Sequence, residues 1–307
     1  MNRINVLMKV VAIVMTVVVS FSLKAQNAAI TPVGKISIGQ DVTRPVHQSD
    51  VDEDIPNSTM INASLRVMII ANQNYWEEDS VGTALNDGRM MKEYCVRTLG
   101  VPEKNVQLKE NRTSAQMKGD VEDFCHTMRI NKGDRFYFFY YGHGMYKFDN
   151  HDSADTYLVP VDGNSLRLVQ TSVSRNWMMK QFENANPEQL LVCLESCYSG
   201  MQNEKDASGF MLVPDVTTPF IGNIVMVTAS RQNQPANAYP DQNHNVFTYE
   251  LLKALKENGG NATWGDMFER VKRNTQRTAW NELRRNQEPS VVASSTLGDA
   301  WKNWSVK

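Results

Sequence analysis

Cysteine is scarce in this sequence, and its placement excludes two common roles of the residue. The 307 residues include four cysteines, Cys95, Cys125, Cys193 and Cys197. They are too few and too widely spaced for a disulfide framework, and they lack the spacing of metal ligands. Cys95 and Cys125 each fall in a predicted helix, either as small buried residues or, in an oxidising compartment, as a bridged pair.

A predominance of one charge sign is also lacking. The chain has 32 Lys and Arg against 34 Asp and Glu, which gives a net charge of -2 at pH 7, and the two signs are interspersed. Because nucleic-acid binding needs a clustered basic surface, we expect no nucleic-acid partner. Hydrophobic residues make up 41% of the chain, which indicates a globular protein.

Long apolar runs are missing except near the start of the chain. Residues 10–23 are mostly apolar and lie between Lys9 and Lys24. This run is shorter than the about 20 residues of a membrane helix, so we predict a secretory signal peptide over residues 1–25, with a retained anchor as the alternative. No other segment is expected to span a membrane, and export would place the mature protein in the periplasm or outside the cell.

After this segment, the pattern changes twice. Residues 26–62 are polar and include three prolines and an acidic run at 50–54, which suits a leader or propeptide, or a solvated linker. From residue 63 onwards, apolar runs alternate with amphipathic segments, and we predict one α/β domain over residues 63–307. Strands are expected at 65–71, 105–109, 136–141, 190–197 and 222–229, and helices at 81–99, 113–128, 174–186, 246–255 and 263–285.

Two of these strands lead into residues that can do chemistry together. An aromatic run beginning at Phe136 ends in His143 between two glycines, and a second run beginning at Leu190 ends in Cys197. Neighbouring parallel strands meet at their carboxyl ends, where open α/β sheets keep their ligands. A nearby imidazole promotes the thiolate, which is the reactive form of cysteine. Cys193 is a weaker nucleophile because burial within the strand would raise its thiol pKa.

Both motifs resemble those of the caspase and metacaspase family of cysteine peptidases, closest to the bacterial metacaspase-like proteins. Residues 141–144 are similar to the family's His-Gly motif, and residues 195–200 resemble the metacaspase pattern Asp-x-Cys-His-Ser-Gly. Further similarity lies at 84–88, 157–160, 228–231 and 246–252. The resemblance implies a caspase-like three-layer α/β/α sandwich with a mainly parallel six-stranded sheet. It also implies that Cys197 is the nucleophile and His143 the general base and acid, with the backbone N–H groups of Gly144 and Cys197 as the oxyanion hole.

Departures from the family pattern bear on specificity. Glu195 stands where metacaspases have aspartate, whereas caspases proper have glutamine there and bind a substrate aspartate through arginines. In metacaspases this acid and the acid of the Asn-Asp segment line the pocket for a basic residue, and the resemblance assigns that role to Glu195 and Asp87. A buried carboxylate needs a cationic partner, so we predict cleavage after Arg or Lys. For Asp87 the alternative is a carboxylate favoured by the helix dipole.

Calcium is a candidate cofactor, because many metacaspases require it. Asp149, Asp152 and Asp155 form the candidate cluster of oxygen ligands, with a solvated acidic loop as the alternative. Residues 203–209 lie where the family often has its activation linker, and Lys205 is a candidate self-cleavage site unless the loop stays uncut. The resemblance also implies a monomer.

These expectations converge on a cysteine endopeptidase that acts on protein or peptide substrates. One alternative is another peptidase with the same plan, legumain-like or clostripain-like, with a different specificity. The other is a catalytically silent caspase-like module that binds partners. The presence of both Cys197 and His143 favours an enzyme, because a degenerate copy would be expected to lose one of them.

Overall fold

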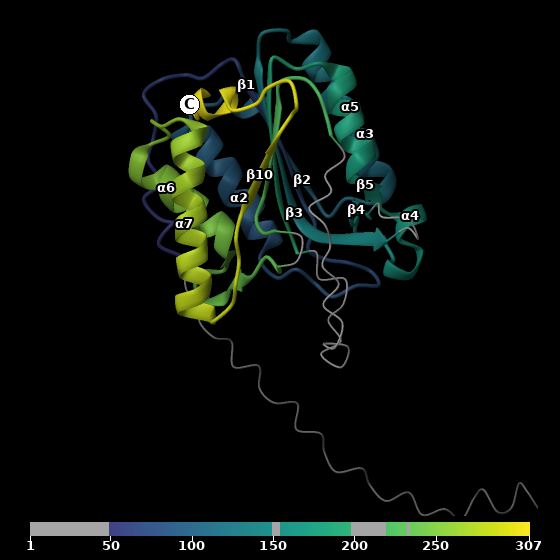
Figure 1. Cartoon of the computed structure of the whole chain (residues 1–307). Coiled ribbons are helices and arrows are strands. Elements are labelled where there is room, and N and C mark those ends of the chain that lie inside the picture. The colour runs from purple at the N-terminus through teal and green to yellow at the C-terminus, as the bar shows by residue number, and fades with distance from the viewer. Residues whose placement is uncertain (1–48, 149–153, 198–218, 232–233) are drawn as a thin grey trace, which may run out of the picture. The chain divides into compact units, whose positions relative to one another are not determined.

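The computed structural model describes residues 49–148, 154–197, 219–231 and 234–307, and a sheet with helices on both faces organises them (Figure 1). The strand order is β10-β7-β6-β3-β1-β2, and all neighbours are parallel except β10 with β7. This confirms the predicted mainly parallel six-stranded sheet. The strands are β1 Leu65–Ala71, β2 Val106–Glu110, β3 Arg135–Phe148, β6 Gln189–Cys197, β7 Ile224–Thr228 and β10 Ser290–Ala293.

Helices cover both faces of this sheet, as in the predicted sandwich. One face carries α2, α6 and α7, and the other carries α3 and α5 (Figure 1). Alternate residues of β1 enter the two cores, with Val67 and Ile69 on one side and Met68 and Ile70 on the other. The helices are α2 Ala84–Glu93, α3 Ser114–Ile130, α4 Leu168–Thr171, α5 Arg175–Ala185, α6 Val246–Asn258 and α7 Trp264–Leu283.

The helix starts agree with their local capping signals. Ser174 accepts a hydrogen bond from the Trp177 N–H at the start of α5, and Thr263 accepts one from the Asp266 N–H at the start of α7. The helix predicted at 81–99 departs from the prediction at both ends. It begins only at Ala84, and from Tyr94 to Thr98 the chain forms a π-helix.

The two cysteines considered for a bridge are free. Cys95 and Cys125 are both buried, and they belong to the cores on opposite faces of the sheet. Burial raises the pKa of each thiol to about 12. The bridged alternative is therefore wrong, and both residues act as small apolar side chains.

Part of the polar segment ahead of β1 is built into the fold. Within residues 49–62, Val51 and Ile55 are buried in the core beneath α2 and α6, and the Tyr94 hydroxyl donates to the Val51 carbonyl. The solvated-linker interpretation is therefore wrong for these residues. The predicted signal peptide and the rest of the segment, up to residue 48, lie outside the described residues.

The strand that carries His143 does not end there. β3 runs on to Phe148, and beyond His143 it leaves the parallel sheet to pair antiparallel with β4 (Ala154–Leu158), which pairs with β5 (Val173–Ser174). A short hairpin of β8 (Ala238–Tyr239) and β9 (His244–Asn245) precedes α6. No helix in the described part of the chain is long and apolar enough to cross a membrane.

Candidate active site

The register of two parallel strands brings the predicted catalytic residues together. His143 on β3 and Cys197 on β6 are backbone partners, and Tyr141 and Glu195 are partners two residues earlier. Cys197 is the last residue of β6, so the pair lies at the carboxyl edge of the sheet. This is the edge at which open α/β sheets bind their ligands.

Neutral groups hold His143 in place. Its backbone N–H donates to the Tyr75 hydroxyl oxygen at 2.8 Å, and the two rings lie with their centroids 4.6 Å apart. The imidazole Nε2 lies 2.7 Å from the carbonyl oxygen of Asp79. Because a carbonyl only accepts, Nε2 carries the hydrogen of the neutral ring, and Nδ1 keeps the lone pair that can accept a proton.

The residue before His143 must be glycine. Gly142 has a φ of 154°, and a Cβ atom there would lie 2.6 Å from the Tyr75 hydroxyl oxygen and 2.7 Å from the Tyr140 hydroxyl oxygen. Any side chain would push these phenols away. The close approach lets Tyr75 reach the backbone of His143.

The residue after His143 has a backbone N–H that β4 does not use. The Val159 N–H donates to the His143 carbonyl at 2.9 Å, and Gly144 is the partner of Leu158 in the β3–β4 ladder. This pattern makes Gly144 and Leu158 a non-hydrogen-bonded pair, so the Gly144 N–H points away from β4.

The loop that holds His143 is itself fixed at several points. The Trp76 N–H donates to the Val161 carbonyl, and the Glu78 carboxylate accepts from the Ser165 N–H at 2.7 Å. Glu77 accepts from the Asn164 side-chain amide. Tyr75 and the Asp79 carbonyl therefore sit on a loop that is hydrogen-bonded to residues 161–165.

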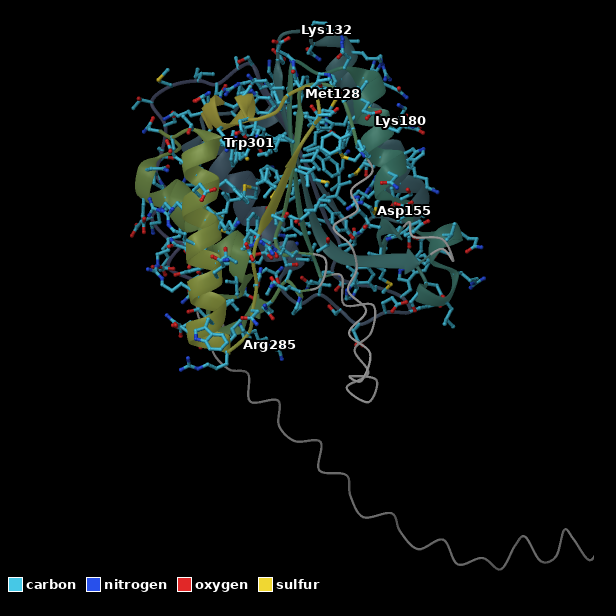
Figure 2. The ribbon with its side chains drawn as sticks, viewed as in Figure 1. Met128, Lys132, Asp155, Lys180, Arg285 and Trp301 are labelled. Atoms are coloured by element: carbon cyan, nitrogen blue, oxygen red, sulfur yellow. The ribbon has the colours of Figure 1, made fainter. Side chains whose placement is uncertain are left out.

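A cavity of about 470 Å³ adjoins His143. It reaches from β3 and β6 to the segment that follows α7, where Arg285 lies just past the end of the helix (Figure 2). The lining residues come from five segments of the chain: Ser80, Val81, Gly82 and Thr83; Gly142 and His143; Glu195; Pro235, Ala236, Asn237, Ala238, Pro240 and Asn245; and Leu283 and Arg285.

Glu195 supplies the acidic wall of this cavity. Its Oε2 accepts from the backbone N–H and the hydroxyl of Thr248, at 3.0 and 2.9 Å, in the first turn of α6. Its Oε1 is buried and has no hydrogen-bond partner among the described residues. Burial, with the charge of Asp87, raises the pKa of Glu195 well above its usual range. An unsatisfied buried carboxylate oxygen favours a cationic partner in the cavity.

Asp87 takes a different position from the one predicted. It lies in the first turn of α2, is fully buried and does not line the cavity. Its Oδ1 lies 2.7 Å from His244 Nδ1, and its Oδ2 accepts from the Asn245 side-chain amide at 2.8 Å. Both carboxylate oxygens of Asp87 are thus already bonded within the protein. Asp87 lies behind Asn245, and Asn245 lines the cavity.

The calcium candidates fall in two groups. Asp149 and Asp152 lie outside the described residues, as does Lys205. Asp155 accepts from the Ser174 hydroxyl at 2.6 Å and from the Thr156 N–H at 2.8 Å, and Figure 2 shows it far from Arg285. Among the described side chains, no group of three His, Cys, Asp or Glu residues is arranged to hold a metal ion.

Sequence reasoning missed several residues of the site. Tyr75 and Asp79 act through a hydroxyl and a backbone carbonyl, which no local pattern indicates. His244 and Asn245 immediately precede α6, and only their place before a helix start could have drawn attention to them. Asp52, which contacts His244, belongs to the acidic run at 50–54 that was interpreted as part of a leader or linker.

This arrangement defines a class: α/β proteins in which a histidine and a cysteine meet at the carboxyl edge of a parallel sheet. The family model described as the caspase domain matches residues 65–300, so the chain belongs to the caspase domain family. Membership of this family supports a cysteine peptidase that acts on protein substrates.

Solved structures agree with the fold. Protein GSU0716 from Geobacter sulfurreducens is similar over 78% of this chain and 96% of its own, with 14% sequence identity and a TM-score of 0.56. At this identity the likeness concerns the fold alone. A comparison with curated proteins gives no match.

Proposed function

We propose that this protein is a cysteine endopeptidase that hydrolyses peptide bonds after Arg or Lys. The observation that supports this specificity is the Oε1 of Glu195, which has no hydrogen-bond partner among the described residues and lies on the wall of the cavity that also contains His143. A guanidinium or ammonium group there would satisfy the oxygen and offset the cost of a buried charge.

The proposed reaction uses His143 and Cys197 in two steps. His143 accepts the proton of the Cys197 thiol, and the thiolate attacks the scissile carbonyl carbon. The N–H groups of Gly144 and Cys197 stabilise the oxyanion, and His143 then protonates the leaving amine. Water activated by His143 hydrolyses the acyl-enzyme and frees the cysteine. The fixed Nε2 of His143 and the direction of the Gly144 N–H support these roles.

The test is turnover by the purified mature protein. Fluorogenic peptides ending in Arg, Lys, Asp and Asn are compared, and Cys197→Ala serves as the inactive variant. We expect turnover after Arg and Lys only. Cleavage confined to Asp or Asn would refute the role of Glu195 and favour a caspase- or legumain-like specificity.

Calcium and cellular location enter the same proposal. We propose that the enzyme acts outside the cytoplasm as a monomer, and that any calcium requirement depends on Asp149 and Asp152. Assays with calcium and with a chelator measure that requirement directly. If the protein shows no turnover in either condition, or after limited proteolysis, the silent binding module replaces the enzyme.

A further inference from the structure

A chain of three charged side chains, the half-buried Asp52 and the buried His244 and Asp87, connects the segment before β1 to α2 and to the hairpin before α6. The His244 side chain is fully buried, with Nε2 at 2.7 Å from Asp52 Oδ1 and Nδ1 at 2.7 Å from Asp87 Oδ1. Both ring nitrogens therefore face carboxylate oxygens. Two carboxylate acceptors favour two N–H donors, which is the protonated ring. Burial raises the pKa of Asp87, and its bonds to His244 and Asn245 oppose that rise.

The groups around the ring support this charge state. Asp52, Asp87 and Glu195 are the charged groups that act on it. The Asn86 amide nitrogen, 3.3 Å from Nε2, donates to Asp52 and to the Asn243 carbonyl and is no acceptor for the ring. Burial alone would lower the pKa of His244, but the two carboxylates outweigh it and raise the pKa to about 9. The imidazolium thus persists at neutral pH.

At one end of this chain of charges, Asp87 connects to the cavity wall. Asp87 accepts from the Asn245 backbone N–H at 3.3 Å and from its side-chain amide at 2.8 Å. Asn245 lines the cavity and is the residue from which α6 begins, and the first turn of α6 binds Glu195 through Thr248. The charge chain therefore fixes the start of the helix that orients the acidic wall.

At the other end of this chain of charges, Asp52 lies on a segment that precedes the matched caspase domain. Asp52 is held there by neighbours on both sides, because Lys256 on α6 donates to the carbonyls of Asp50 and Glu53 and because Val51 is buried. The matched domain begins only at residue 65. The segment thus brings a charge to the site from outside the matched region.

We propose that Asp52 and His244 are specificity-determining positioning residues, which hold Asn245 and Glu195 in the geometry that binds a basic substrate side chain. This inference rests on the proposed function, because it names what maintains the cavity that function requires. Neither residue touches the substrate. Both act through Asp87 and the start of α6.

The kinetic test compares two substitutions that remove the same charge from the same segment. Asp52→Asn breaks the contact with His244, whereas Glu53→Gln changes an exposed neighbour. For an arginine peptide, we expect Asp52→Asn to raise KM about tenfold with kcat little changed, and Glu53→Gln to leave both unchanged. A merely structural defect would reduce the active fraction, which lowers apparent kcat and leaves KM unaltered. An unchanged KM in Asp52→Asn, or equal changes in both variants, overturns the inference.

A binding measurement separates this inference from the proposed function. In the Cys197→Ala background, calorimetry measures the affinity for an acetylated tripeptide with a carboxyl-terminal arginine amide, and for its alanine counterpart. We expect Asp52→Asn to weaken only the arginine peptide. If wild type cleaves nothing but this selective loss is seen, the proposed function fails and the inference stands. If wild type cleaves after Arg and the selective loss is absent, the proposed function stands and the inference fails.

Discussion

The two sides of the candidate site are built from different kinds of interaction. His143 is held by a phenol and a backbone carbonyl, both neutral. On the other side, Glu195 is oriented by a helix start that depends on the half-buried Asp52 and the buried His244 and Asp87. The supports of His143 contact its backbone N–H and its Nε2, and neither contacts Nδ1, the nitrogen that accepts the proton in the proposed reaction. The acidic wall, in contrast, is sensitive to the loss of any one charge.

The largest expected effect lies on the charged side, at Glu195. We expect Glu195→Gln to lower kcat/KM for an arginine peptide about 100-fold, because a guanidinium in the cavity would lose its buried charge partner. Turnover of peptides with a neutral residue should not fall. Glu188→Gln, at the exposed start of the same chain segment, is the matched control. Equal losses for both peptides would place Glu195 outside the specificity site.

The second prediction concerns stability and pH. The pKa of His244 is raised from 6.5 to about 9 in the folded protein, which corresponds to about 3 kcal/mol of stability. Since the folded pKa is the higher one, this contribution is complete below pH 6.5 and is lost as the pH rises through 9. Denaturant unfolding at both ends of this range measures it.

The controls for this measurement are two histidine variants. His244→Gln should be less stable than wild type at low pH and should lose less stability as the pH rises. His126→Gln, at an exposed position on α3, should follow the wild-type curve. Identical pH dependence in His244→Gln and wild type would show that the ring is not charged in the fold.

On the neutral side, Tyr75→Phe removes the hydroxyl that accepts the His143 N–H. We expect kcat to fall about tenfold, because a buried donor loses its acceptor and the histidine loses its fixed position. The ratio of kcat/KM for arginine over alanine peptides should be unchanged, which distinguishes this variant from Glu195→Gln. A shift in that ratio would mean that the two sides are coupled.

The smallest effect is expected at Cys193, in the core beneath the acidic wall. Burial raises the pKa of its thiol well above the usual range, so it does not act as a nucleophile. We expect Cys193→Ala to cost about 1 kcal/mol of stability and to leave kcat within about twofold. Loss of turnover comparable with that of Cys197→Ala would reassign the nucleophile.

The sequence was most informative where a residue's role follows from local pattern. Apolar runs predicted the parallel strands, and the positions of His143 and Cys197 after two such runs predicted the catalytic candidates. Such features depend on neighbours in the chain, which periodicity reports.

Long-range contacts were not predictable in the same way. Asp87 was predicted to line the pocket, whereas it lies behind the cavity, because its partners His244 and Asn245 come from far along the chain. β10 is short and lacks a strong apolar pattern, and β3 continues past His143 because β4 provides a partner there. In each case the deciding interaction joins segments whose proximity only the folded chain establishes.

The contact between Asp52 and His244 also has a consequence for the order in which the molecule is completed. The two residues are 192 positions apart in the chain. Contacts of such separation form late, because the entropy of closing the loop must first be overcome. At a synthesis rate of about 5 to 20 residues per second, roughly 10 to 40 s pass between the two residues. A nascent chain therefore completes the acidic cavity only after α6 has been made, when the histidine and cysteine strands are already present.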